Sequence, residues 1–174
     1  IAPELYLKRL VVGGLERVYE INRNFRNEGL STQHNPEFTM LEFYQAYATC
    51  ADLMGLTEEL LASLARQLKG GTKVVYQGQE IGLEPPYRRL TVHAALSEAL
   101  QVQEELLRDP GQIRSLARGC GLEPSPASPP GKVLMELFEE KVERTLVQPT
   151  FIIDFPLDVS PLSRKKEGQE DLVD

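Results

Sequence analysis

Long apolar runs are missing from this chain of 174 residues. No stretch approaches the roughly 20 consecutive apolar residues that a membrane-spanning helix needs. The first residues also lack a basic region followed by an apolar one, which is the pattern of a secretory leader. These two absences predict a soluble protein that is not exported and has no membrane partner.

Cysteine and positive charge are both in short supply. Cys50 and Cys120 are the only two cysteines, and neither has a neighbour at metal-ligand spacing, so we expect reduced structural thiols and a cytoplasmic protein. The 19 basic residues are outnumbered by 26 acidic ones, which gives a formal net charge of −7. Since nucleic-acid phosphates are bound by clustered Lys and Arg, this chain alone is not expected to bind a nucleic-acid backbone.

The two ends of the sequence indicate a longer parent protein. The chain begins with Ile1 rather than Met, and residues 164–174 are charged and contain no closing apolar element. The length suits a single hydrophobic core. We therefore expect one domain's worth of material taken from a larger protein.

Helical and strand patterns are interspersed along the chain. Apolar residues recur at helical spacing in five segments and alternate with polar ones, or form short runs, in several others. The predicted helices are residues 3–12, 53–68, 92–100, 110–119 and 133–146, and the predicted strands are 17–27, 38–48 and 151–155, with a strand-turn-strand unit at 72–90. Because these elements do not alternate one for one, they favour an α+β fold with an antiparallel β-sheet core flanked by helices.

Three local features of these elements are also predicted. Asp52 is expected to cap the helix at 53–68, and Thr91 to cap the helix that follows it. The leucines of the first of these helices form an apolar stripe, which we expect to pack on the sheet.

One face of the predicted hairpin is rich in polar side chains. Arg26 and Glu28 share a face at the end of the first strand, and Phe38, Glu42 and Tyr44 share one on the second, together with Met40. Phe38 and Glu42, four residues apart, would be separated by about 13 Å and could serve opposite ends of an elongated ligand. Arg26 suits a carboxylate or phosphate between them, whereas a buried Glu42 would require a cationic partner. An ordinary solvated or ion-paired face remains an alternative, because periodicity alone does not decide between them.

The order of these residues resembles a known signature. Residues 25–29 (FRNEG) and 34–42 (HNPEFTMLE) are similar to the second signature motif of class II aminoacyl-tRNA synthetases. Residues 1–10 (IAPELYLKRL), 29–31 (GLS) and 42–44 (EFY) resemble the lysyl enzymes rather than the aspartyl or asparaginyl ones. Residues 148–151 (QPTF) and 158–163 (DVSPLS) are similar to the same family. The likeness covers the whole chain and is least marked between about 70 and 130.

The resemblance implies a role for each matching position. The position of Arg26 binds the ATP α-phosphate and the amino-acid carboxylate, and is the catalytic one. Glu28 would meet the adenine amino group, Phe38 would stack on adenine, and His34 and Asn35 would contact the nucleotide. Glu4 would hold the α-ammonium of lysine, and Glu42 with Tyr44 its ε-ammonium.

The same resemblance implies a reaction and a domain layout. Lysine and ATP would form lysyl-adenylate and pyrophosphate, and the lysyl group would pass to tRNA(Lys), with Mg²⁺ bound by residues beyond Asp174. Residues 1–174 would be a partial catalytic domain, in which about 72–130 form an insertion or peripheral helical region. The N-terminal anticodon-binding barrel, the first motif of the homodimer interface and the third motif would lie outside it, so we expect the isolated segment to form no adenylate.

Other polar residues are interpreted as structural. His93 lies on a predicted helix far from the motif, where a histidine with satisfied hydrogen bonds is the favoured interpretation. Asp154, Asp158 and Ser160 follow the last strand and are assigned a supporting role. The cluster Arg164–Lys166 stands beside acidic residues and predicts a solvated turn.

Two alternatives stay open at this point. A synthetase paralogue could use the same adenylate chemistry to attach lysine to a protein, as the ligase that modifies elongation factor P does. A synthetase-like module without catalysis could instead bind a partner or sense an amino acid. The charged and aromatic face speaks against the second, since a module without chemistry has no need of it.

Overall fold

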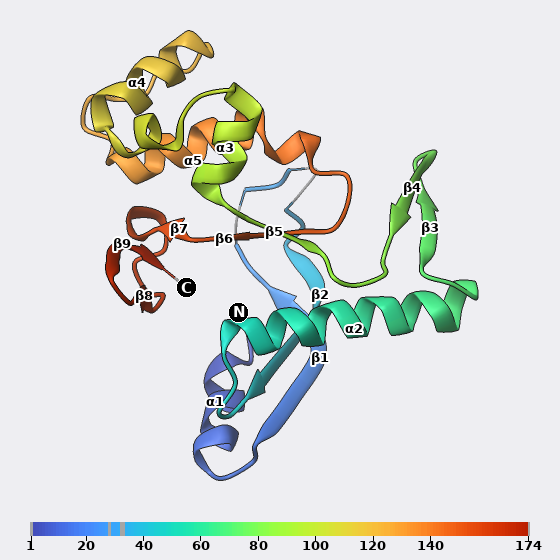
Figure 1. Cartoon of the computed structure of the whole chain (residues 1–174). Helices are drawn as coiled ribbons and strands as arrows, with labels where there is room; N and C mark the ends of the chain where they lie inside the picture. The colour runs from blue at the N-terminus through green and yellow to red at the C-terminus, as the bar shows by residue number, and fades with distance from the viewer. Residues whose placement is uncertain (1, 28, 32–33, 174) are drawn as a thin grey trace. The chain divides into compact units, whose positions relative to one another are not determined.

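The computed structural model describes residues 2–27, 29–31 and 34–173. By the density of its internal contacts the chain divides into two compact units, Ile1–Leu53 and Met54–Asp174. Figure 1 shows the elements of each unit. None of the helices in the described ranges is both long and apolar enough to cross a membrane.

The first unit consists of one helix and a two-stranded antiparallel hairpin. Helix α1 spans Glu4–Val12, strand β1 spans Arg17–Phe25 and strand β2 spans Glu37–Gln45. The register runs from Arg17 opposite Gln45 to Phe25 opposite Glu37. The Arg26 N–H donates to the carbonyl of Pro36 at 3.0 Å and so extends the pairing by one residue. The predicted hairpin and helix are therefore confirmed.

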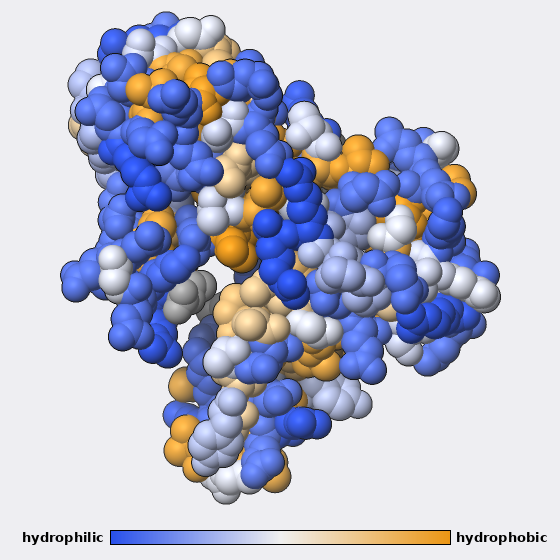
Figure 2. Space-filling view, viewed as in Figure 1, coloured by the Kyte–Doolittle hydropathy of each residue, from blue (hydrophilic) through white to orange (hydrophobic). Residues whose placement is uncertain are grey.

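The polar face of the hairpin is its better protected face. Apolar side chains on the opposite face are largely exposed, among them Tyr19 at 72% and Ile21 at 65%. Figure 2 shows several hydrophobic residues at the surface of the first unit. Helix α1 contributes to the difference, because its Lys8 ammonium lies over the ring of Tyr44 on the polar face.

Helix α2 spans Cys50–Lys69 and begins earlier than the sequence pattern predicts. Its N-terminal cap is Thr49 rather than Asp52. The Asp52 carboxylate accepts hydrogen bonds from the Thr49 N–H and hydroxyl, both at 2.7 Å, and the Asp52 N–H donates to the Thr49 hydroxyl at 3.4 Å. This reciprocal pair is a capping box, and the two hydrogen bonds from Thr49 lower the pKa of Asp52. The predicted cap was therefore off by one helical turn.

The buried face of α2 is also not the predicted one. Its buried residues are Glu58, Ala62 and Ala65. The leucines expected to pack on the sheet are between 38% and 76% exposed: Leu56, Leu60, Leu61, Leu64 and Leu68. The Glu58 carboxylate accepts the Tyr87 N–H at 2.9 Å and an Arg89 N–H at 3.3 Å. These polar contacts, invisible to a hydrophobic pattern, orient the helix.

Two short strand pairs follow in the second unit. Strands β3 (Lys73–Tyr76) and β4 (Gln79–Gly82) form an antiparallel hairpin whose turn residues, Gln77 and Gly78, both have positive φ. This confirms the strand-turn-strand unit. Strand β5 (Arg88–Thr91) pairs in parallel with β6 (Thr150–Ile153). The Gln148 side chain, just before β6, accepts the Gly82 N–H at 3.0 Å and donates to the Glu80 carbonyl at 2.9 Å.

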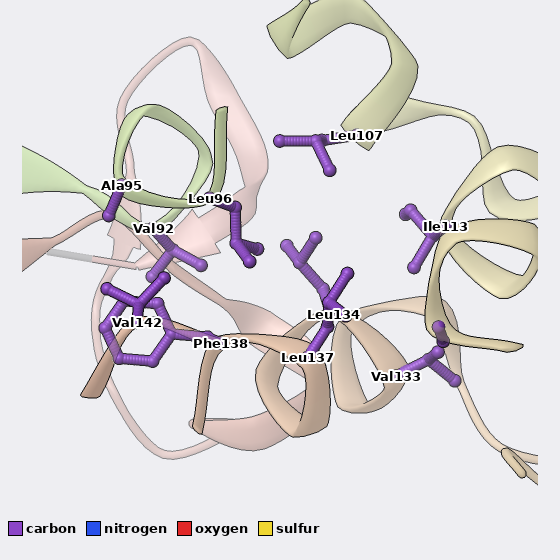
Figure 3. Close-up of a cluster of buried hydrophobic side chains, with 11 residues drawn as sticks. Val92, Ala95, Leu96, Leu107, Ile113, Val133, Leu134, Leu137, Phe138 and Val142 are labelled. Carbon is purple, nitrogen blue, oxygen red and sulfur yellow. The ribbon is translucent and has the colours of Figure 1, made fainter. Parts of the chain in front are cut away.

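The hydrophobic core lies among the helices that follow β5. They are α3 (Val92–Leu100), the 3-10 helix η1 (Glu104–Arg108), α4 (Pro110–Gly119), α5 (Pro130–Lys141) and the 3-10 helix η2 (Glu143–Thr145). Thr91 caps α3 as predicted, by accepting the Ala94 N–H at 2.9 Å. Figure 3 shows the side chains that these helices contribute, including Val92, Leu96, Leu107, Ile113, Val133, Leu134, Leu137 and Phe138.

The last segment contains strands β7 (Phe155–Pro156), β8 (Lys165–Lys166) and β9 (Gln169–Val173), with the 3-10 helix η3 (Leu157–Val159) between the first two. Strand β9 pairs with both of the others. The Lys166 ammonium lies 2.6 Å from the carboxylate of the buried Asp154. Part of the basic cluster is therefore a structural ion pair and strand, not the solvated turn predicted.

The predicted α+β class holds only in its coarse form. The structure mixes helices with small, mostly antiparallel sheets. A single antiparallel sheet does not form the core of the described residues. The described core is instead helical, and β5 and β6 are parallel. Sequence periodicity detects strands but not the strand beside which each one will lie.

Replacement of Glu58 tests the polar anchor of α2. Glu58→Ala leaves the buried Tyr87 N–H without its acceptor, and we expect a loss of about 1–3 kcal/mol in unfolding free energy. The exposed neighbour Glu59→Ala is the matched control and should stay within about 0.5 kcal/mol. Urea denaturation measures both. Equal midpoints for the two variants would show that Glu58 does not anchor the helix.

Candidate functional site

The candidate site is the polar face of the β1–β2 hairpin. In the observed register Glu20 lies opposite Glu42, Asn24 opposite Phe38, and Val18 opposite Tyr44. Side chains directly opposite each other in an antiparallel pair project to the same side of the sheet. Phe38, Glu42 and Tyr44 therefore share one face, as predicted, and Arg26 reaches it from just beyond β1.

The loop end of this face carries a cation over an aromatic ring. The Arg26 guanidinium lies 5.2 Å from the centroid of the Phe38 ring. No carboxylate among the described residues forms an ion pair with Arg26. A guanidinium stacked on a ring retains its in-plane N–H donors, which match the oxygens of a phosphate or carboxylate. This end can bind an anion next to a flat ring.

The opposite end of the face is acidic. The Tyr44 hydroxyl donates to the Glu42 carboxylate over a long 3.4 Å. Burial raises the pKa of Tyr44, and the nearby carboxylates of Glu42 and Glu4 raise it further. The phenol therefore stays protonated at neutral pH and can orient the carboxylate. This end can bind a cation.

Helix α1 brings a further carboxylate and an ammonium to the acidic end. The Lys8 ammonium lies 2.5 Å from Glu4 and 5.7 Å from the centroid of the Tyr44 ring. The hydrogen bond with Glu4 and the charge of the same carboxylate raise the pKa of Lys8. The candidate Glu4 is thus already paired with a residue of its own helix.

The loop between the strands holds the remaining candidates. The Ser31 hydroxyl lies 2.8 Å from His34 Nδ1, and the two residues exchange backbone hydrogen bonds at 3.3 Å. Both His34 and Asn35 are exposed. Glu28 lies outside the described residues, so its predicted place is untested.

Sequence reasoning placed a further row of polar side chains on this face of β1 but assigned no role to them. The amide of Asn24, only 4% exposed, donates to Asn22 at 3.0 Å, and the Asn22 amide donates to Glu20 at 2.8 Å. The alternation of polar residues along β1 carried this signal. Lys8 was missed, because only the fold places α1 beside Tyr44.

The described residues contain no group of three or more His, Cys, Asp or Glu side chains that could hold a metal ion.

Asp158, assigned a supporting role, accepts the Gly131 N–H at 2.8 Å at the start of α5. Asp154 is paired with Lys166, and Ser160 ends η3. These residues have structural partners in the second unit.

His93 lines a recess of about 250 Å³ in the second unit, beside Arg108, Asp158 and Asp171. Burial lowers the pKa of His93, and the charge of Arg108 lowers it further, against smaller opposing effects that include a hydrogen bond to the Leu107 backbone. The imidazole is therefore neutral at pH 7 and hydrogen-bonded, as the structural interpretation predicts.

The family of the chain follows from comparison with known proteins. A family model described as tRNA synthetases class II (D, K and N) matches residues 1–174. The chain belongs to this family.

Within the family, the chain is similar along its whole length to lysine–tRNA ligases. It is 51% identical over 173 residues to that of Carboxydothermus hydrogenoformans, a match that covers 99% of the chain and 36% of the relative. It is 52% identical over 180 residues to that of Pelotomaculum thermopropionicum, covering 99% and 35%. It is 53% identical over 175 residues to that of Thioalkalivibrio sulfidiphilus, covering 100% and 35%. The chain thus spans about a third of the length of the curated relatives it matches, and the resemblance to lysyl enzymes is confirmed.

The lowered pKa of His93 predicts a pH dependence of stability. The unfolded chain takes up a proton near pH 6.5, the usual histidine value, whereas the folded form resists protonation to a lower pH. Stability from the neutral imidazole is therefore present above pH 6.5 and is lost as the pH falls. We expect His93→Gln to flatten the decline of unfolding free energy below pH 6.5, measured by urea titration at several pH values. Identical slopes for the two proteins would contradict this assignment.

Proposed function

We propose that the protein carrying this chain is a lysine–tRNA ligase, which activates lysine with ATP and transfers it to tRNA(Lys). The observation that carries the proposal is the single hairpin face with a guanidinium and ring at one end and carboxylates at the other. An aminoacyl adenylate of lysine has the matching order of groups, from aromatic base through phosphate to ammonium. Similarity to lysine–tRNA ligases along the whole chain supports the same function.

The loop end is proposed to bind ATP. Phe38 would stack on adenine, and Glu28 would accept from the adenine amino group. His34 and Asn35 would contact the nucleotide from the loop. Arg26, next to Phe38, would hold the α-phosphate. The position of the guanidinium over the Phe38 ring supports this role, because its N–H donors lie close to the ring that would carry the base.

The acidic end is proposed to bind lysine. Glu42 would pair with the ε-ammonium while the Tyr44 hydroxyl orients it. Glu4 would pair with the α-ammonium, and Arg26 would hold the carboxylate. Four residues of strand between Phe38 and Glu42 correspond to about 13 Å. This spacing supports ATP and lysine bound end to end along the face, in the order of groups of a lysyl-adenylate.

The chemistry proposed for this face is positioning and charge stabilisation. A lysine carboxylate oxygen would attack the α-phosphorus of ATP, forming the mixed anhydride as the bond to the β-phosphate bridging oxygen breaks and pyrophosphate leaves. Arg26 would offset the negative charge that develops on the α-phosphoryl oxygens. A hydroxyl of the tRNA terminal adenosine would then attack the lysyl carbonyl and release AMP. Neither step requires a covalent bond to the protein.

Other parts of the proposal concern the whole protein. Magnesium would be bound by residues beyond Asp174. The roles proposed for the residues of this chain do not include binding it. The protein would act as a cytoplasmic homodimer. Contact with tRNA would lie mainly outside this acidic chain.

The two alternatives have less support. The three relatives described above are lysine–tRNA ligases, and this similarity gives no support to a ligase that modifies a protein. A module without catalysis gives no reason for Arg26, Phe38 and Glu42 to share one face of the hairpin.

The protein encoded by the complete coding sequence should catalyse ATP–pyrophosphate exchange that depends on lysine. Exchange supported by aspartate or asparagine instead would overturn the proposed substrate. Exchange with lysine but no charging of tRNA(Lys) would favour the protein-modifying alternative.

Arg26→Ala should lower kcat for lysine-dependent exchange by about 10²–10³-fold. The substitution removes a positively charged hydrogen-bond donor that would stabilise the transition state. Arg23→Ala is the matched control. Arg23 lies three residues earlier, on β1 and on the opposite face, 3.5 Å from Glu37. If both arginine variants lose activity equally, the effect is not specific to the proposed face.

Glu42→Gln should raise the KM for lysine about ten- to a hundredfold, the usual worth of a hydrogen bond to a charged group. The KM for ATP should stay near its normal value, since Glu42 lies at the other end of the face. Glu37→Gln, on the opposite face, is the control. A rise in the KM for ATP rather than for lysine would reverse the proposed orientation of the substrate.

A further inference from the structure

An ammonium group already occupies the acidic end of the hairpin face. Lys8 Nζ lies 2.5 Å from Glu4 Oε1 and 5.7 Å from the centroid of the Tyr44 ring. Glu4 and Tyr44, two of the three residues proposed to recognise substrate lysine, therefore contact a lysine side chain of the protein itself.

The position of Lys8 follows from helix geometry. Residues four apart in a helix lie on the same side, one turn from each other, so Glu4 and Lys8 are neighbours on α1. The flexible four-carbon stem of Lys8 lets its ammonium reach the ring of Tyr44 on β2. Substrate lysine has the same ammonium on the same aliphatic stem. The ammonium of Lys8 and the ε-ammonium of substrate lysine are therefore chemically equivalent, and the same partners can bind either one.

We propose that Lys8 is an internal counter-ion of the amino-acid subsite, which pairs with Glu4 beside the Tyr44 ring until substrate lysine displaces it. This inference rests on the proposed function, because it takes the substrate to be lysine. It assigns to Lys8 a role in setting lysine affinity, not in catalysis.

Displacement of Lys8 is physically accessible. The side chains of Lys8 and Glu4 are 56% and 57% exposed, and exposed ion pairs contribute little to stability. The cost of breaking the pair is therefore small, and Lys8 can return its ammonium to water. Lysine affinity is nevertheless reduced by this competition, since the substrate must first break an existing contact.

Lys8→Met tests the inference, because methionine retains an unbranched apolar stem and removes the charge. In the protein encoded by the complete coding sequence we expect the KM for lysine in ATP–pyrophosphate exchange to fall about two- to fivefold, the worth of an exposed pair. The KM for ATP should not change. Lys8→Arg keeps the positive charge and should remain close to the unsubstituted protein.

The control is Lys73→Met. Lys73 also forms an exposed pair, with Glu80 at 2.8 Å, in the β3–β4 hairpin. Its loss should leave the KM for lysine unchanged. Lys8→Gln provides a second neutral variant, for which the KM for lysine must move in the same direction as for Lys8→Met.

The outcomes separate this inference from the proposed function. Absence of lysine-dependent exchange in the unsubstituted protein would overturn the proposed function itself. Exchange in the unsubstituted protein, with an unchanged or raised KM for lysine in both neutral Lys8 variants, would overturn the counter-ion role. A raised KM would indicate that Lys8 binds the substrate, for instance through the lysine carboxylate.

Discussion

The antiparallel register of β1 and β2 is the constraint on which the candidate site depends. Side chains of a strand alternate between its two faces, so a shift of one residue would move every side chain to the other side. In the observed register Glu42 lies opposite Glu20, and Phe38 opposite Asn24. The bond from the Arg26 N–H to Pro36 carries the same alignment into the loop. Arg26, Phe38 and Glu42 share a face only because this alignment holds.

The distribution of charge on that face reverses the usual arrangement of a hairpin. Polar groups occupy the protected face, and apolar side chains such as Tyr19 and Ile21 remain exposed. Two carboxylates opposite each other are unfavourable unless cations approach them. In the first unit an ammonium from α1 lies at this end of the face. The face therefore carries charged groups for which the ligand is proposed to supply the opposite charges.

Polar groups in the second unit have a different role, because their partners come from the chain itself. Glu58 accepts a hydrogen bond from the Tyr87 N–H, and Asp154 forms an ion pair with Lys166. The His93 ring is hydrogen-bonded to the Leu107 backbone. Among the described residues no buried side-chain nitrogen or oxygen lacks a hydrogen-bond partner. These contacts stabilise the fold of the second unit.

Local pattern alone determined much of this protein. Alternation along residues 17–27 and 38–48 predicted the hairpin and its polar face, and Thr91 predicted the start of α3. Motif order pointed to the family, which the comparisons confirm. Only the tertiary structure decided that α2 buries Glu58 and its alanines, that β5 pairs in parallel with β6, and that Lys8 reaches Tyr44. Periodicity reports which residues share a face, whereas the partner of that face is set by contacts between residues far apart in the chain.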